Sequence, residues 1–195
     1  MMIEPDVAHE CPAAMLLVDV INHFDFPQGD CLLGNAFRIA PALGRLKRRA
    51  REAGIPTVYV NDNFGQWRSN FSQLLNYCLR PDAPGRDFVE QLKPDDEDYL
   101  VLKPMHSAFY QSPLDTLLHR LGAKTLILTG LASNSCILCT AHDANMRDFR
   151  LFVPGDCCAA RSEHEHWQAI EHIGSLNSAD VRPSTELDLE GLARG

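Results

Sequence analysis

Residues 124–130 read Lys-Thr-Leu-Ile-Leu-Thr-Gly, an apolar run that is typical of a buried strand. The turn Leu131–Ser135 follows, and Cys136 then opens a helix-forming stretch, Cys136-Ile-Leu-Cys-Thr-Ala-His-Asp-Ala144. A strand that ends at Gly130 delivers this turn to the carboxyl edge of a sheet, where open α/β folds place their ligand sites. The start of the helix directs free N–H groups and a positive dipole end at the sulfur. The pattern therefore predicts a nucleophilic thiol of low pKa, with a buried structural cysteine as the alternative.

Apolar runs rich in Val, Ile and Leu alternate with helical patterns along the rest of the chain. The predicted strands, the last of them weaker, are Ala14–Val20, Thr57–Val60, Tyr99–Leu102, Thr125–Thr129, Leu151–Val153 and Ser178–Val181. The predicted helices are Ala36–Ala53, Leu114–Leu121, Cys136–Phe149 and Glu163–Ile173. Continuous rather than alternating hydrophobicity in the strands indicates that both faces of the sheet are covered. We therefore expect a Rossmann-like α/β fold with a doubly wound parallel sheet of about six strands.

The composition is typical of one globular domain, which we expect to span residues 1–195. The chain is 45% hydrophobic and 23% charged, and its net charge of -8 repels nucleic acids. The apolar run Ala13–Val18 is too short to span a bilayer and lacks the flanks of a secretion signal. Seven irregularly spaced cysteines favour reduced thiols over a disulfide framework. These observations predict a cytoplasmic protein with a small-molecule substrate and neither a nucleic-acid nor a membrane partner.

The segment Asn61–Asp98 differs from the rest of the chain because it carries three prolines and several aromatic residues. It reads as a long excursion with one short helix near Phe71–Cys78, placed as a cap over the strand ends. Its aromatic residues would expose apolar surface, which favours a homo-oligomer, either a dimer or a tetramer.

Two further strands end in groups that a thiolate needs. Asp19 interrupts the first apolar run near its end, and Lys103 closes the third run before a proline. Taken alone, Asp19 reads as the cap of a turn and Lys103 as an exposed strand-end lysine. Because parallel strands end at the same edge of a sheet, Asp19, Lys103 and Cys136 together predict a base, a cation and a nucleophile at one site.

These residues resemble those of the isochorismatase-like cysteine hydrolases, a superfamily that includes nicotinamidases and N-carbamoylsarcosine amidases. The resemblance covers roughly residues 14–160. It is carried by Asp19, by Lys103-Pro-Met-His-Ser-Ala-Phe109 and by Thr129-Gly-Leu-Ala-Ser-Asn-Ser-Cys136.

The resemblance implies hydrolysis of a C–N bond in a small amide, ureido or carbamoyl substrate through a thioester. Asp19 would take the proton of the Cys136 thiol and later give it to the leaving nitrogen, while Lys103 holds the charges together. Backbone N–H groups of Ala132 and Cys136 would form the oxyanion hole, which the family builds with a cis peptide, here between Leu131 and Ala132.

Two departures from the family patterns bear on substrate and cofactor. Nicotinamidases carry an Asp-x-His metal motif after the second strand, whereas this chain has Asp62-Asn-Phe64 there. We therefore expect no metal and no other cofactor, and nicotinamidase activity stays an alternative only. Isochorismatases that cleave an ether lack the nucleophilic cysteine at this position, so Cys136 argues against that activity.

Other interpretations remain open at this stage. Cys136-x-x-Cys139 followed by Cys157-Cys158 could form a zinc or dithiol redox site, although an adjacent pair is a poor second half for zinc. A non-catalytic member of the same fold would have lost one of the three polar groups, and none is lost. The histidines His23, His106 and His142 favour structural roles. The aromatic residues proposed to line the substrate pocket, each of which could equally belong to the core, are Phe24, Phe26, Phe64 and Trp67.

Overall fold

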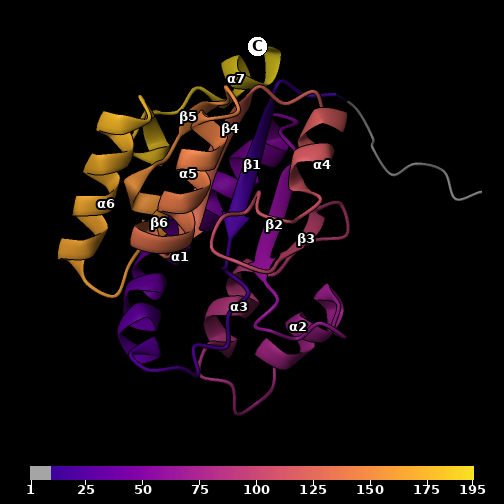
Figure 1. Cartoon of the computed structure of the whole chain (residues 1–195), viewed down its shortest axis with the longest axis vertical. Helices are drawn as coiled ribbons and strands as arrows, with labels where there is room; N and C mark the ends of the chain where they lie inside the picture. The colour runs from indigo at the N-terminus through magenta and orange to yellow at the C-terminus, as the bar shows by residue number, and fades with distance from the viewer. Residues whose placement is uncertain (1–9) are drawn as a thin grey trace, which may run out of the picture.

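The computed structural model describes residues 10–195, which form a parallel sheet between two layers of helices (Figure 1). Its strands lie in the order β3-β2-β1-β4-β5, and the short β6 pairs with the end of β4. Their bounds are β1 Ala13–Val18, β2 Thr57–Asp62, β3 Tyr99–Lys103, β4 Thr125–Leu131, β5 Arg150–Phe152 and β6 Cys158–Ala159. Every strand pair is parallel. The predicted doubly wound sheet of about six strands is confirmed.

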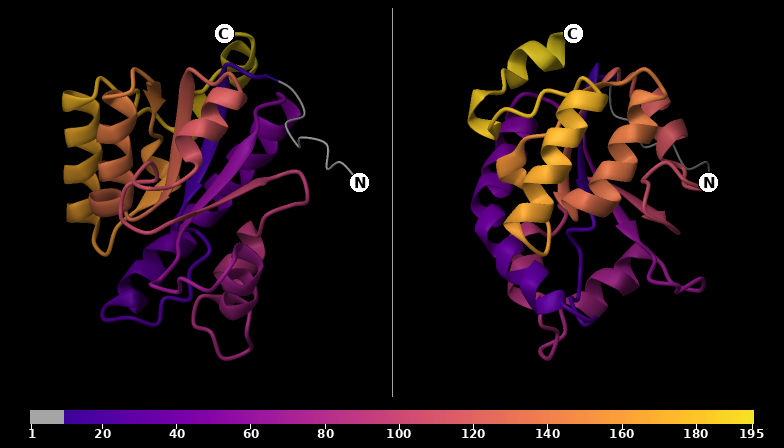
Figure 2. Two further views of the ribbon diagram at one scale, coloured as in Figure 1. Left: turned by 45° about the vertical axis from the view of Figure 1, so that its right-hand side comes forward. Right: turned by 60° about the vertical axis from the view of Figure 1, so that its left-hand side comes forward.

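Seven α-helices accompany the sheet within the described residues. They are α1 Gly29–Glu52, α2 Phe71–Cys78, α3 Arg86–Leu92, α4 Leu114–Arg120, α5 Leu138–Asn145, α6 Glu163–Leu176 and α7 Leu189–Arg194. Figures 1 and 2 show α5 and α6 on one face of the sheet and the long α1 on the other. Alternate residues of β1 divide between the two cores, Met15 and Leu17 on the α1 side and Leu16 and Val18 on the α5 side. Both faces of the strand are therefore buried, as its continuous hydrophobicity predicts.

The predicted sixth strand is wrong. Residues 178–181 make one isolated bridge, between Phe152 and Asp180, and the sixth strand is instead Cys158–Ala159. Asp180 accepts hydrogen bonds from the backbone and side chain of Arg182 through one carboxylate oxygen. Such local bonding competes with a strand ladder, and it turns the chain away after a single bridge.

Several element boundaries also differ from the prediction. Helix α1 begins at Gly29, seven residues earlier than predicted, because its first two turns mix buried, half-buried and exposed residues and lack a continuous apolar stripe. The predicted helix Cys136–Phe149 is divided into a π-helical turn, Ser133–Ile137, and α5. Cys136 therefore lies within a helical turn that begins three residues before it.

The excursion Asn61–Asp98 holds the predicted helix α2 and a second helix, α3, that the sequence did not reveal. Asn70 caps α2 by accepting a hydrogen bond from the backbone N–H of Gln73. Helix α3 begins two residues after Pro84 and packs on α1. Figure 1 places both helices beyond the carboxyl ends of the strands, where a cap was predicted. Within residues 10–195, no helix has the length and apolar character needed to cross a membrane.

A glycine is required where β4 passes β1. Gly130 has φ 115°, and a Cβ atom there would lie 2.1 Å from the carbonyl oxygen of Val18. Only a residue without a side chain allows the two strands to approach this closely just before the cysteine turn.

We expect Gly130→Ala to lower the free energy of unfolding by about 3 kcal/mol or more, because it combines backbone strain with a clash against backbone. Urea unfolding monitored by circular dichroism measures this change. The matched control is Gly34→Ala in α1, where an added Cβ meets nothing within 4 Å. This substitution should raise the free energy of unfolding by up to about 1 kcal/mol, because Ala favours a helix more than Gly does. If Gly130→Ala were as stable as Gly34→Ala, residue 130 would tolerate a Cβ atom, and the argument for a required glycine would be wrong.

Candidate active site

Asp19, Lys103 and Cys136 come together at the carboxyl edge of the sheet. The Lys103 Nζ lies 2.9 Å from Oδ2 of Asp19 and 3.6 Å from Sγ of Cys136. Besides burial, the negative charge of Asp19 acts on the Cys136 thiol and raises its pKa. The lysine cation thus contacts both the carboxylate and the thiol.

Asp19 is held in place by backbone geometry and by a neighbouring strand. It follows β1 directly and adopts a left-handed conformation with φ 53°, which turns the chain out of the sheet. Its Oδ1 accepts a hydrogen bond of 2.7 Å from the backbone N–H of Asp62. Both carboxylate oxygens therefore have partners, as burial of this charge requires. The alternative of a simple turn cap does not describe these contacts.

Lys103 is fully buried, which excludes the alternative of an exposed strand-end lysine. As the last residue of β3, it directs its Nζ to Asp19, to the carbonyl oxygen of Met105 at 3.1 Å and to Oδ2 of Asp62 at 3.6 Å. The role of Asp62 as a second carboxylate of this cluster was missed by the sequence analysis. Its signal was available, because Asp62 ends the strand between those of Asp19 and Lys103.

Cys136 lies in the π-helical turn Ser133–Ile137, directly after the end of β4. The peptide bond between Leu131 and Ala132 is cis, as the family resemblance implies. The carbonyl oxygen of Ala132 accepts hydrogen bonds from Ser135 N–H at 3.0 Å and Ile137 N–H at 3.2 Å. π-Helical turns are rare and recur at functional sites. The turn places the thiol and the backbone N–H groups of Ala132 and Cys136 within five residues.

His106 is a further titratable group beside the thiol, which differs from the structural role that its sequence position favoured. The exposed His106 side chain lies with Nδ1 3.9 Å from Sγ of Cys136 and 3.4 Å from Oγ of Ser135. Its position three residues after Lys103 is the signal that could have placed it at the site.

The electrostatics of the site do not produce the low thiol pKa that the helix start predicts. Burial and the negative charge of Asp19 raise the pKa of Cys136 to about 12, against the opposing effect of Lys103. Burial also raises the pKa of Asp19. Although burial lowers the pKa of Lys103, the negative charge of Asp19 opposes it, and the pKa is raised overall. At neutral pH, Cys136 is therefore a neutral thiol, and the pKa of the Asp19 carboxyl is raised as well.

The remaining cysteines do not assemble a second site in the part of the chain that the structure describes. All seven are free, and no group of three or more His, Cys, Asp or Glu side chains is arranged to hold a metal ion. Cys158 is buried and donates a weak hydrogen bond to the carbonyl oxygen of Leu128. Cys139 lies in α5, and Cys157 is buried in the α1 core.

A cavity of about 440 Å³ is lined mainly by residues of the loop after β2, of α2 and of β3, and Asp19, Lys103 and Cys136 are not among its lining residues. Two of the lining residues, Asn63 and Leu102, are chain neighbours of Asp62 and Lys103, and Phe64 follows Asn63. The other lining residues are His23, Gln66, Arg68, Ser69, Gln73, Leu74 and Tyr77. This lining contains a guanidinium and no carboxylate, although the chain as a whole carries a net charge of -8.

The four aromatic residues considered for the pocket have different positions. Phe64 lines the cavity and lies 4.9 Å from the His23 ring, measured between centroids. Phe24 is buried in the core against Phe88, and Phe26 packs at the edge of the same core. Trp67 is 77% exposed. Only sequence position and residue type were available to separate them, and neither reports burial.

The sequence model of the isochorismatase domain family matches residues 13–183 of the chain. The chain is 34% identical over 174 residues to the uncharacterized isochorismatase family protein YaaI of Bacillus subtilis, covering 89% of this chain and 95% of that one. N-carbamoylsarcosine amidase of Thermoplasma acidophilum has a similar structure, with TM-score 0.68, 27% identity and coverage of 90% and 98%. Pyrazinamidase/nicotinamidase of Streptococcus mutans shares the fold at TM-score 0.67 and 22% identity, with coverage of 87% and 99%.

We expect Asp19→Asn to speed alkylation of Cys136 by iodoacetamide about threefold to tenfold at pH 8. Loss of the carboxylate removes a contribution that raises the thiol pKa, while the Lys103 cation stays in place. In the unchanged protein, the exposed Cys31 should react before Cys136. Mass spectrometry of the labelled peptides gives both rates.

The control variant is Asp82→Asn, which removes an exposed carboxylate from the loop after α2. It should leave the rate at Cys136 unchanged. A slower or unchanged rate in Asp19→Asn would mean that Asp19 does not oppose ionisation of the thiol.

Proposed function

The chain belongs to the isochorismatase family, and from that premise we propose that it is a cysteine hydrolase that cleaves a C–N bond in a small amide, ureido or carbamoyl substrate. The observation that carries the proposal is the contact of one lysine with both a carboxylate and a thiol at the carboxyl edge of the sheet. A non-catalytic protein would have no need to place a half-buried thiol against a buried ion pair.

In the first step, Sγ of Cys136 attacks the carbonyl carbon while Asp19 accepts the thiol proton. A thiol whose pKa is about 12 is scarcely ionised at neutral pH, so attack and proton transfer belong to one event. A C–S bond forms, and the carbonyl π electrons move to the oxygen. The N–H groups of Ala132 and Cys136 would stabilise that oxygen.

In the second step, the tetrahedral intermediate collapses and the C–N bond breaks. Asp19 returns its proton to the leaving nitrogen, which departs as ammonia or an amine and leaves a thioester on Cys136. Water then attacks the thioester with Asp19 again as the base, which frees the acid and restores the thiol. Lys103 stays charged throughout and stabilises the carboxylate each time it forms.

The substrate class rests on the cavity and on the similarity to amidases. A volume of about 440 Å³ suits a small molecule, and the lining combines aromatic faces with amide groups and Arg68. Because no carboxylate lines the cavity, substrates that carry an acid group fit it better than cationic ones. The solved relative of 27% identity is an N-carbamoylsarcosine amidase, which supports a ureido or carbamoyl compound.

Nicotinamidase activity is the second candidate. It is favoured by the shared fold of the Streptococcus mutans pyrazinamidase/nicotinamidase. It is disfavoured by the Asp62-Asn63-Phe64 stretch, which lacks the metal-binding histidine of the nicotinamidase motif. Ammonia release over a panel of ureido acids, carbamoyl compounds, simple amides and nicotinamide separates the two, with Cys136→Ala as the blank.

We expect replacement of Asp19 by Asn, Lys103 by Met or Cys136 by Ala to lower kcat/KM at least about 1000-fold on the best substrate of that panel. Any two of these changes together should add little, because the three groups act as one unit. Steady-state kinetics on folded variants gives the values. Turnover by Cys136→Ala at the rate of the unchanged enzyme would exclude the thioester route. Cys31→Ala should leave kcat/KM unchanged, because that thiol is exposed on α1 and has no part in the proposed reaction.

We expect chelators to leave activity intact. No step above uses a metal, and the described residues contain no cluster of three or more metal-binding side chains. Dialysis against EDTA followed by assay and metal analysis makes the measurement. If EDTA removed the activity and zinc or iron restored it, the protein would be a metal-dependent hydrolase and this prediction would be wrong.

A further inference from the structure

A buried hydrogen bond joins helix α6 to the turn that carries the thiol. Nδ1 of His166 lies 2.7 Å from Oγ of Ser133. Ser133 is fully buried and His166 is 8% exposed. Because burial removes competition from water, the partners of these two groups are fixed by the protein.

Ser133 occupies a sensitive position in the chain. It is the first residue of the π-helical turn, it follows the cis peptide between Leu131 and Ala132, and it precedes Cys136 by three residues. A shift of Ser133 therefore displaces both N–H groups that the proposed mechanism assigns to the oxyanion hole.

Helix α6 is a stable base for this bond. Ser162 caps its N-terminus by accepting from Glu165 N–H, and Ala169, Ile170 and Ile173 bury its inner face. The His166 ring is fixed from the side by Trp167, with centroids 4.6 Å apart in an edge-on arrangement.

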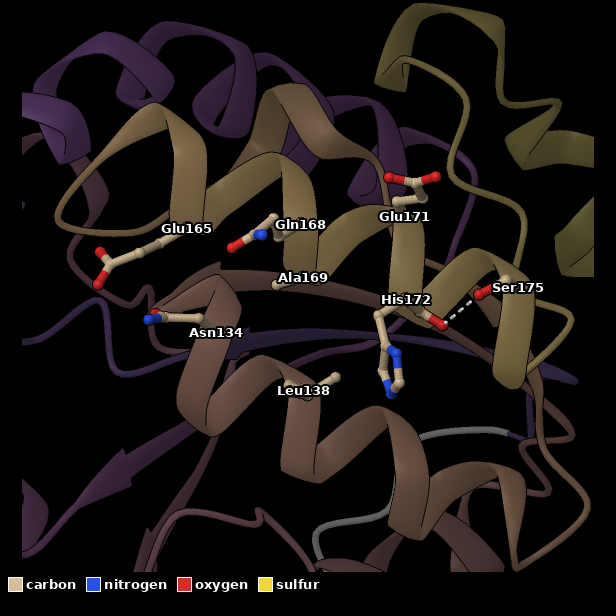
Figure 3. Close-up of a pocket in the computed structure, with 8 residues that line it drawn as sticks. All are labelled: Asn134, Leu138, Glu165, Gln168, Ala169, Glu171, His172 and Ser175. Carbon is tan, nitrogen blue, oxygen red and sulfur yellow. Dashed lines mark hydrogen bonds between the residues drawn. The ribbon is translucent and has the colours of Figure 1, made fainter.

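The rest of the interface between α6 and α5 is more open. A hollow of about 600 Å³ lies between the two helices, bounded by Asn134 and Leu138 on one side and by Gln168 and His172 on the other (Figure 3). His142 of α5 also hydrogen bonds to Asn177 at the end of α6 at 3.0 Å, whereas the bond from His166 to Ser133 reaches the turn itself.

We propose that His166 is a positioning residue, which holds Ser133 and thereby fixes the backbone N–H groups of Ala132 and Cys136 for the reaction. The proposal rests on the proposed hydrolase function. His166 does not touch the reacting atoms, and its effect passes through the Ser133 hydroxyl. Catalytic donors must be held within about 0.5 Å of their productive positions, so release of one anchor reduces turnover without removing the substrate cavity.

The structure offers a matched set of variants. His166→Asn places an amide near the position of Nδ1, His166→Gln places its amide one bond farther out, and His166→Phe keeps a ring without a hydrogen bond. His164→Asn changes an exposed histidine of the same helix and serves as the control. Ser133→Ala removes the other partner.

On the substrate found by the ammonia screen, we expect His166→Phe to lower kcat about tenfold or more with KM within about twofold. Loss of a complete oxyanion donor costs about 100-fold to 1000-fold, so a displaced donor costs less. His166→Asn should recover most of kcat and His166→Gln should not. The double variant with Ser133→Ala should be no slower than His166→Phe alone, because both changes remove one bond.

Amide hydrogen exchange tests the anchor without any substrate. His166→Phe should raise exchange of the peptide covering residues 131–138 at least about threefold, while His166→Asn and His164→Asn leave it unchanged. Equal exchange in all variants overturns the proposal, as does an equal loss of kcat in His166→Asn and His166→Gln. If the unchanged enzyme hydrolyses nothing in the panel, the proposed function fails, and the exchange measurement still decides whether His166 holds the turn.

Discussion

The buried ion pair between Lys103 and Asp19 is the interaction on which the site depends. Lys103 has no contact with solvent, and an ammonium group in that position requires a carboxylate at hydrogen-bond distance. Removing one partner of such a pair costs about 3–5 kcal/mol, since the other charge stays buried. The pair connects the ends of β1 and β3 across β2, and Asp62 of β2 contacts both groups. The carboxyl edge of three strands is thus fixed by one cation.

The convergence of Asp19, Lys103 and Cys136 could be predicted because it depends on strand direction alone. Parallel strands end at one edge, and the apolar runs locate those ends to within two residues. Other features depend on packing. The difference between Phe24 in the core and Phe64 in the cavity wall is set by burial, which a local pattern does not contain. The sixth strand was misplaced for a similar reason, because a two-residue strand carries no periodicity.

The pKa of Cys136 could not be predicted from the neighbouring sequence. A helix start and a nearby lysine both favour the thiolate, and the sequence shows both. Burial and the carboxylate of Asp19 oppose them and prevail. At neutral pH the proton therefore stays on sulfur, and the proposed reaction would move it to Asp19 as the thiol attacks. This arrangement protects the thiol from unwanted alkylation and oxidation, which require the thiolate.

In the proposed hydrolase, the reacting groups and the substrate cavity lie on different parts of the chain. The reacting groups lie on strand ends and on the turn after β4, where a Cβ at Gly130 would clash with the Val18 carbonyl oxygen. The loop that follows Lys103 is joined to α5 by a short Ser107–Asp143 hydrogen bond and by the bond from Ala108 N–H to Thr140 Oγ1. The cavity, in contrast, takes most of its lining from residues 63–77 of the excursion, beyond the sheet. Substitutions in that segment can alter the cavity without moving the ion pair, so in the proposed hydrolase the substrate can change while the reacting groups stay in place.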